Sequence, residues 1–491
     1  MEMPTRTSRA LVIGAVMASM AMVALEATIV STAMPQIVAQ LGGLRLYAWV
    51  FSAFLLTQTA MTVVFGKLAD VYGRRPMMFV SIAIFAAGSV LAGFAWSMPS
   101  IIAFRLIQGV GAGGIMPVAM TVVADLYPAR ERGKIQGYLA SVWATSAVLG
   151  PMAGGLIVRD LTWSWIFWIN VPIGLVAAAL FFAFLHEDVK RERRAIDVAG
   201  AALFTLAVAA LMVALTQTES TTPAQQWGAA GVFGVSLVLF LVQERYAVDP
   251  MISFALWQRR PIAAANGAAM ISGVALIGLT TFLPMFVQAV LHRSPVVAGL
   301  TLTMIMLGWP CGATTAARTF PRFGLRRIML VGSILLPLGA SVFVFLTPTS
   351  SPLAAGLGSL IVGLGMGLVS TTSIVLIQEI VDWSHRGSAT ASNLFARNLG
   401  STLGAAALGA VLNYGLGHAQ GIGVITSDQL RQTIEAPAGS GNLAVALALG
   451  QSLHATFWAI LAISLLSVLM AGLMPSIEIG HTRRAQEAPA E

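Results

Sequence analysis

The sequence is short of charge and nearly free of cysteine. Asp, Glu, Lys and Arg make up only 10% of its 491 residues, whereas about a quarter of an average soluble domain is charged. The single cysteine, Cys311, excludes an internal disulfide and has no metal ligand nearby, so we interpret it as a packing residue. The six histidines are dispersed along the chain, although a metal centre or an enzyme site within the spans would need clustered side chains. We therefore expect no metal site, no cofactor and no enzymatic activity.

Long apolar runs are what the sequence has in abundance. Hydrophobic residues account for 57% of the chain, and the mean hydropathy is +0.83. A helix of about 20 apolar residues crosses a bilayer, whereas strands of a membrane barrel would show ~10-residue alternating segments. The pattern predicts an all-α integral membrane protein with fourteen transmembrane helices. The expected spans are residues 10–33, 46–69, 77–96, 99–126, 135–158, 165–185, 197–216, 228–246, 262–289, 295–317, 327–347, 353–380, 388–416 and 454–474.

The positive charges predict the orientation of these helices. If both termini lie inside, as an even number of spans permits, 22 of the 28 Lys and Arg residues fall in inner loops and tails. The remaining ones are Arg45, Arg159, Arg293 and Arg431 outside, with Arg105 and Arg397 inside spans. The positive-inside rule then predicts a multi-pass protein of the cell (inner) membrane with both termini in the cytoplasm. Because the basic residues are scattered over short loops, no nucleic-acid partner is expected.

An internal repeat predicts the domain organisation. A shift of 254 residues superimposes several glycines and charged residues of the chain on later ones. The matches are Gly109, Gly111 and Gly113 with Gly363, Gly365 and Gly367, Asp125 with Glu379, Arg132 with Arg386, and Gly150 with Gly404. We therefore predict a six-helix half over 1–188, a linker with helices seven and eight over 189–260, and a second six-helix half over 261–491. Two halves of the same orientation are one plan of secondary transporters.

Four sequence motifs resemble those of a known family. GKLADVYGRRP, 66–76, resembles the loop signature between spans two and three of the major facilitator superfamily, and LGPMAGG, 149–155, resembles an antiporter signature in span five. LEATIVSTAMP, 25–35, and WSWIFWINVPIG, 163–174, resemble span-one and span-six motifs of its fourteen-helix drug/proton antiporter family. The chain departs from the family pattern with Glu26 for aspartate and Ser31 for asparagine.

The resemblance implies both a fold and a function. It implies the major facilitator fold, with two six-helix halves and two inserted helices, and a proton-coupled multidrug efflux antiporter that confers drug resistance. Such a protein exports amphiphilic drug-like small molecules by alternating access, contacts membrane lipids and is expected to act as a monomer. A lipid or fatty-acid exporter on the same fold is the nearest alternative. A nutrient symporter fits the span-five signature less well, and a channel does not fit the repeat.

A cluster of charged residues and glycines predicts an inner gate. Contacts that form in one state and break in the other bias an alternating-access equilibrium, and Asp125 is the expected partner of Arg74. Gly66 is expected to allow close helix approach and Gly73 to form a tight turn. The alternative is that these charges only set topology. The predicted inner-gate residues are Gly66, Lys67, Asp70, Gly73, Arg74, Arg75 and Asp125.

Small residues in span five predict close helix packing. Gly150, Pro151, Gly154 and Gly155 remove side chains from one stretch, and Pro151 removes one backbone hydrogen bond. The family resemblance interprets this as a bent helix that seals against the other half. Ordinary small-residue helix packing is a compatible alternative.

Two buried charges predict a proton-coupling pair. Glu26 lies nine residues before Pro35, about 13 Å below that end, and Arg105 lies six residues after Pro99, about 9 Å below its own end. In the fold that the resemblance implies, both spans line the central cavity, so the two side chains are expected to face each other. Burial disfavours the charged form of a carboxylate, whereas a nearby guanidinium favours it. A carboxylate whose guanidinium is close in one state and distant in the other can therefore exchange a proton. The alternative is a static pair that joins spans one and four.

The second half offers no comparable acid. Arg397 is the only arginine deep within its spans, and no acidic residue lies at its depth, so Arg397 is expected either to bind helix carbonyls and water or to contact substrate. We assign Arg397, Gln108 and Asn393 to a candidate substrate cavity. With Glu26 as the one deep acid, the charge of the substrate stays open.

Overall fold

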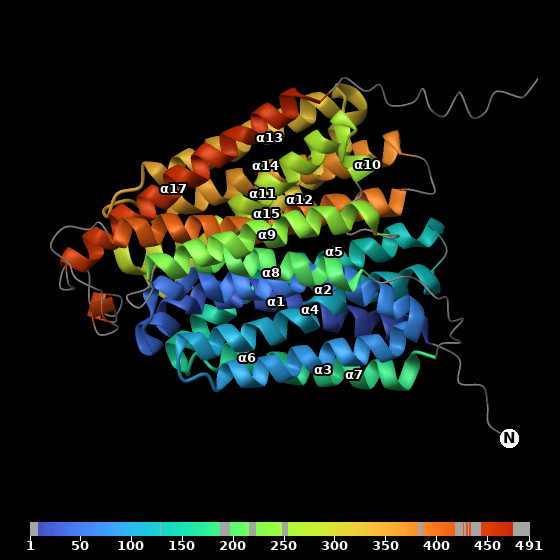
Figure 1. Ribbon diagram of the computed structural model, residues 1–491, viewed down its shortest axis with the longest axis horizontal. Helices are drawn as coiled ribbons and strands as arrows, with labels where there is room; N and C mark the ends of the chain where they lie inside the picture. The colour runs from blue at the N-terminus through green and yellow to red at the C-terminus, as the bar shows by residue number, and fades with distance from the viewer. Residues whose placement is uncertain are drawn as a thin grey trace, which may run out of the picture. The chain divides into compact units, whose positions relative to one another are not determined.

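The computed structural model is built from helices, and no strand occurs in the part of the chain that it describes (Figure 1). The described residues are 8–127, 129–186, 197–215, 222–247, 254–381, 386–417, 426, 429–430, 432–433 and 443–474. Thirteen described helical segments are long and apolar enough to cross a membrane. A shorter apolar helix, Ala199–Leu215, occupies the place of the seventh predicted span. The expectation of an all-α membrane protein with fourteen helices is confirmed.

The chain divides into two compact units. Unit 1 comprises Met1–Met251, Leu283–Leu300 and Ala405–Ser452, and unit 2 comprises Ile252–Phe282, Thr301–Gly404 and Leu453–Glu491. Helix α8 packs against α9 and along α2, so both inserted helices belong to unit 1. The boundaries predicted at residues 188 and 260 stay a prediction.

The first repeat and the inserted helices occupy the chain up to Tyr246. The helices are α1 (Arg9–Leu41), η1 (Leu44–Leu46), α2 (Tyr47–Tyr72), α3 (Arg74–Gly93), α4 (Met98–Leu126), α5 (Ala129–Asp160), α6 (Trp165–Trp168), α7 (Asn170–Phe184), α8 (Val198–Leu215) and α9 (Pro223–Tyr246). Helix α4 packs along both α2 and α3, and α1 packs against α4, α5, α6 and α7. We call α1 to α7 the first repeat.

The second repeat follows the inserted helices. Its helices are α10 (Phe254–Trp257), α11 (Arg260–Met285), η2 (Phe286–Val290), α12 (Pro295–Phe323), α13 (Leu325–Val344), α14 (Pro352–Ile380), α15 (Arg386–Gly417) and α17 (Leu443–Gly472). Helices α4 and α14 both have 29 residues, and α3 and α13 both have 20. Each long helix starts after a serine N-cap, Ser97 or Ser351, with proline in its first turn.

Glycines pack the two repeats in the same way. A Cβ atom on Gly111 of α4 would lie 2.6 Å from the carbonyl oxygen of Ser81 on α3, and one on Gly365 of α14 would lie 2.8 Å from that of Gly332 on α13. Such distances leave no room for a side chain, so helix backbones are in direct contact at both places. The positions differ by 254 residues in one helix and 251 in the other, which gives the repeat predicted from the sequence a structural basis.

One interpretation of the sequence is wrong. Cys311 was expected to pack within its span, but its side chain is exposed on α12. Helix α12 therefore turns this position away from the interior of unit 2.

Candidate functional site

The centre of the site is a buried carboxylate on α1. Glu26 has no exposed surface. Its Oε1 accepts a hydrogen bond from Nη1 of Arg105 on α4, and the two side chains form an ion pair. Its Oε2 accepts a hydrogen bond of 2.6 Å from Nδ2 of Asn170 at the start of α7. The expected approach of Glu26 and Arg105 is therefore present, and a third helix joins them.

Neutral groups hold the guanidinium of Arg105 as well. Its Nε donates to the carbonyl oxygen of Val50 at 3.2 Å, and Nη1 also donates to Oε1 of Gln108 at 2.7 Å. The guanidinium carbon lies 4.1 Å from the ring centroid of Phe54, where the ring face attracts a cation. Arg105 thus has partners on α2 and α4 that do not depend on the charge of Glu26.

Gln108 extends this network towards α3. Its Nε2 donates to Oγ of Ser89 at 2.8 Å, while its Oε1 accepts from Arg105. The amide is fully buried and uses both its donor and its acceptor within unit 1. Gln108 therefore lies beside the Glu26–Arg105 pair, and its assignment to a substrate cavity stays a prediction.

Asn170 is the second hydrogen-bond partner of Glu26, and sequence reasoning missed it. It lies inside the motif WSWIFWINVPIG and is the only side chain there that carries an amide. A polar residue in an otherwise apolar and aromatic run was the available signal. The side chain is fully buried, and its Oδ1 accepts no hydrogen bond from any described residue.

The predicted inner gate contains one ion pair with the expected partners. Nε of Arg74, the first residue of α3, lies 3.0 Å from Oδ2 of Asp125 near the end of α4. Gly73 has a φ of 98° and forms the turn between α2 and α3. The side chains of Lys67 and Asp70 lie outside the described part of the structure. The role of these residues as a gate stays a prediction.

Two other predicted gate residues contact neighbouring helices. Nη2 of Arg75 donates to the carbonyl oxygen of Phe182 at 2.8 Å, and its guanidinium lies 5.3 Å from the centroid of that ring, so Arg75 joins α3 to α7. A Cβ on Gly66 would lie 3.8 Å from Cβ of Pro117, which is an ordinary contact. Among the described atoms an alanine would fit there, and the role of Gly66 in close helix approach stays a prediction.

The span-five motif packs α5 on two neighbours within unit 1. Gly150 faces Thr28 of α1, whose Oγ1 donates to the carbonyl oxygen of Ser146 at 3.3 Å. Gly154 faces Ile29 on the same helix. On another side, a Cβ on Gly155 would lie 2.8 Å from Cα of Val296 at the start of α12.

The neighbouring turn of α12 repeats this close contact. A Cβ on Gly299 would lie 2.5 Å from the carbonyl oxygen of Pro151. The glycines of α5 therefore lie against α1 and α12, and Gly299 of α12 lies against α5. The role of the motif as a seal stays a prediction. Gly299 was not identified from the sequence.

Arg397 has an aromatic partner inside unit 2. Its guanidinium carbon lies 5.2 Å from the ring centroid of Trp309 on α12. Among the described side chains no acidic partner is found for it. The alternative roles of Arg397, in structure or in substrate contact, stay open.

Asn393 lies in a separate polar cluster of unit 2. Its Nδ2 donates to Oδ1 of Asn266 at 3.0 Å, and Nδ2 of Asn266 donates to Oγ of Ser392 at 3.3 Å. Nε1 of Trp257 also donates to Oγ of Ser392, at 2.7 Å. The contacts join α10, α11 and α15, and the assignment of Asn393 to a substrate cavity stays a prediction.

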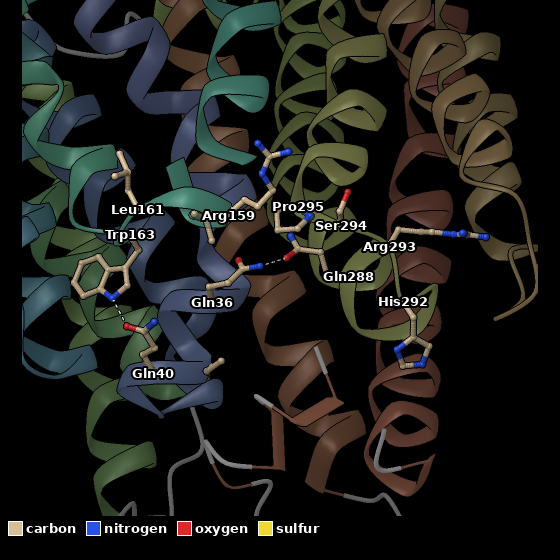
Figure 2. A pocket seen from close by; sticks show the side chains of 12 residues that line it. Gln36, Gln40, Arg159, Leu161, Trp163, Gln288, His292, Arg293, Ser294 and Pro295 are labelled. Carbon is tan, nitrogen blue, oxygen red and sulfur yellow. Dashed lines mark hydrogen bonds between the residues drawn. The ribbon is translucent and has the colours of Figure 1, made fainter. Parts of the chain in front are cut away.

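Unit 1 also contains a cavity away from the Glu26 network. Figure 2 shows Gln36 and Gln288 facing each other across it, with Nε2 of Gln36 donating to Oε1 of Gln288 at 2.5 Å. Nε2 of Gln288 donates further to the carbonyl oxygen of Thr32 at 3.1 Å. The volume is about 310 Å³. The lining residues are Gln36, Ala39, Gln40, Val158, Arg159, Leu161, Trp163, Gln288, His292, Arg293, Ser294 and Pro295.

Hydrogen bonds between lining side chains join the helices around the cavity. Nε1 of Trp163 donates to Oε1 of Gln40 at 2.8 Å, and the side chain of Arg293 extends away from the glutamine pair (Figure 2). The glutamines therefore join α1 to η2 at the end predicted to face outward. Within the described residues, no three His, Cys, Asp or Glu side chains gather closely enough to hold a metal ion.

Comparison with known proteins gives consistent results. The sequence profile of the Major Facilitator Superfamily matches residues 16–405. Multidrug resistance protein 3 of Bacillus subtilis is 34% identical over 393 residues, which are 79% of this chain and 77% of the relative. The multidrug transporter protein MdtP of the same organism is 33% identical over 411 residues, covering 83% and 76%.

A solved structure shares the fold. It is a bacterial homologue of the human lysosomal transporter Spinster in an inward-facing, unoccupied conformation, with a TM-score of 0.67 and 17% identity. The match covers 96% of this chain and 99% of that one. At this identity the likeness concerns the fold alone.

Proposed function

Because the chain belongs to the Major Facilitator Superfamily, which is a family of transporters and not of enzymes, we propose that it exports amphiphilic drug-like molecules in exchange for protons. Export proceeds by alternating access of a central site to the two sides of the membrane. The names of the two Bacillus subtilis relatives support drug-like cargo. The protein is proposed to act as a monomer in the cell (inner) membrane. The distribution of Lys and Arg supports an orientation with both termini in the cytoplasm.

One observation carries the proton-coupling part of the proposal. Glu26 is the only acidic residue deep within a predicted span, and it is fully buried against Arg105. A charge in this position is costly in a membrane protein and points to function. The ion pair favours the carboxylate, whereas the apolar surroundings favour the neutral acid, so a small change around the pair is enough to move a proton.

The transport cycle follows from these opposing effects. A proton from the outer side neutralises Glu26 and weakens its bond to Arg105, which keeps its bonds to Val50 and Gln108. After the change of access, cargo from the inner side favours the deprotonated form, and the proton leaves inward. Cargo then leaves outward as the cycle returns. Inward proton flow thus drives outward export.

Two contacts are suited to alternate during this cycle. The ion pair between Arg74 and Asp125 lies at the predicted inner end, and the bond between Gln36 and Gln288 lies at the predicted outer end. The glutamine bond joins a helix of the first repeat to one of the second, so it breaks if these helices separate. The ion pair joins α3 and α4, which stay packed together, so it acts on the ends of these helices. Only contacts that differ between the two states bias their equilibrium.

Transport in proteoliposomes tests the proposal. An acidic lumen is expected to drive accumulation of a fluorescent lipophilic monocation by the wild type, and Glu26→Gln is expected to abolish the dependence on the pH gradient. Glu244→Gln makes the same chemical change at another buried acid on α9 and is expected to retain it. Coupled transport that survives in Glu26→Gln contradicts the proposal. Movement of labelled fatty acid without dye movement would identify a lipid exporter.

A further inference from the structure

The side chain of Asn170 uses only half of its hydrogen-bonding capacity. Its Nδ2 donates to Oε2 of Glu26 at 2.6 Å, but its Oδ1 accepts no hydrogen bond from the described residues. The side chain has no exposed surface. A buried amide oxygen without a hydrogen-bond partner is unfavourable, so the presence of an asparagine at this position needs an explanation.

The two oxygens of Glu26 are not equivalent as sites for a proton. Arginine donates hydrogen bonds and cannot accept them, so a proton on Oε1 would point at the Nη1 donor of Arg105. Oε2 is the remaining site. A proton there faces Nδ2 of Asn170, which is also a donor, and the two hydrogens repel.

A side-chain amide can resolve this conflict without moving its helix. It carries a donor and an acceptor on one planar group, and the two ends exchange places by a half-turn about the bond between Cβ and Cγ. After that turn, Oδ1 accepts a hydrogen bond from the protonated carboxyl group. In the present arrangement, Nδ2 donates to the carboxylate, which is a stronger, charge-assisted bond.

We propose that Asn170 is a positioning residue for proton exchange at Glu26, whose amide donates to the carboxylate and, after a half-turn, accepts from the carboxylic acid. The inference rests on the proposed proton coupling at Glu26. Asn170 is the first residue of α7, so the strength of the bond between α1 and α7 changes with the protonation of Glu26.

Other charged groups do not provide this function. On the elements packed against α1, the titratable group that faces Glu26 is Arg105 of α4. Helices α6 and α7 contain no titratable residue. The nearest ones on α5, Tyr138 and Arg159, lie at least eight residues from the stretch 146–150, which contacts Leu25 and Thr28 beside Glu26. Arg105 itself is held by neutral partners in either state, which leaves the amide as the part that turns.

The pH profile of transport tests the inference. Asn170→Leu keeps the size of the side chain and removes both its donor and its acceptor, so the neutral acid gains relative to the carboxylate. Half-maximal proton-driven dye transport is expected at a pH about one unit higher, a roughly tenfold change in proton affinity, with less than a twofold change in the KM for dye. Asn413→Leu makes the same change at another buried amide, which donates to the carbonyl oxygen of Arg45, and is expected to leave the pH midpoint unchanged.

The possible outcomes separate this inference from the proposed function. If Glu26→Gln stays proton-coupled, the proposed function fails. If Glu26→Gln loses coupling and Asn170→Leu keeps the wild-type pH midpoint, only the role of Asn170 is overturned.

A measurement on the wild-type protein tests the inference even if Asn170→Leu does not fold. Infrared difference spectra between acidic and neutral pH, with side-chain-labelled asparagine, are expected to show an amide band that shifts in the wild type and not in Glu26→Gln. A wild-type spectrum without such a shift would overturn the inference.

Discussion

The two repeats have helices of matching length but carry different buried side chains. Helices α4 and α14 have the same length, so Arg105 corresponds to Ser359, and the alignment of Pro35 with Pro284 places Ala275 opposite Glu26. Ala275 and Ser359 are both buried. The same positions therefore hold an ion pair in the first repeat and two small residues in the second.

The rest of the network follows the same pattern. Gln108 of the first repeat corresponds to Val362, which is also buried. The second repeat keeps one deep charge, Arg397, whose observed partner is the ring of Trp309. The repeated glycines therefore belong to helix packing that both repeats share, whereas the proposed proton exchange has its acid in the first repeat.

Removal of the arginine is expected to have the largest effect. Arg105→Gln leaves Glu26 buried without a cation, which costs about 3–5 kcal/mol when a buried pair is broken on one side. We expect a matching loss of unfolding free energy in detergent and no coupled transport. The double variant Glu26→Gln/Arg105→Gln is expected to recover most of the stability without transport, and Ser359→Ala in the second repeat to change little. An Arg105→Gln protein as stable as the wild type contradicts the comparison.

Matched glycine substitutions test the shared backbone. A Cβ at Gly111 or Gly365 meets a carbonyl oxygen of the neighbouring helix, and this obstacle cannot rotate away. Each alanine variant is expected to lose about 1–3 kcal/mol of unfolding free energy, with similar values in the two repeats. Gly14→Ala, which meets no atom within 4 Å, serves as the control. A loss confined to one repeat would show that the packing is not equivalent.

The turns before α3 and α13 allow a finer test. Gly73 and Gly324 have φ values of 98° and 78° with ψ near the extended range, at 154° and 155°, a region that is essentially restricted to glycine. Alanine at either position is expected to cost on the order of 1 kcal/mol by thermal unfolding. Gly231→Ala, within α9 and without a close neighbour, controls for the general effect of alanine. Unequal losses of stability at the two turns would show that the backbones of the two repeats are not equivalent there.

The smallest stability effect is expected at the predicted inner gate. The side chain of Asp125 is 52% exposed, so Asp125→Asn should change the unfolding free energy by less than about 1 kcal/mol. If the pair with Arg74 holds the inner end closed, the transport rate changes severalfold at nearly unchanged stability. The counterpart Glu379→Gln provides the comparison. Identical rates in the wild type and Asp125→Asn would remove the gate role.

Much of this arrangement could be predicted from the sequence because it depends on periodicity and depth. Apolar length gave the spans, and the 1.5 Å rise of a helix placed Glu26 and Arg105 at similar depths. The charge pattern at the ends of α3 and α4 indicated the pair between Arg74 and Asp125. Each of these follows from position along a helix axis.

The features that escaped prediction depend on helix rotation and on distant contacts. The bond from Asn170 to Glu26 requires α7 to turn its first residue towards α1, and the ring of Trp309 lies 88 residues before Arg397 in the sequence. A single sequence does not specify which faces of helices meet.

Proton release on cargo binding tests the central claim most directly. Purified protein in weakly buffered detergent solution, at a pH where Glu26 is partly protonated, is mixed with a lipophilic monocationic dye while the bulk pH is recorded. The account predicts release of protons from the wild type and from Glu244→Gln, and none from Glu26→Gln. Equal release from the wild type and Glu26→Gln would contradict it.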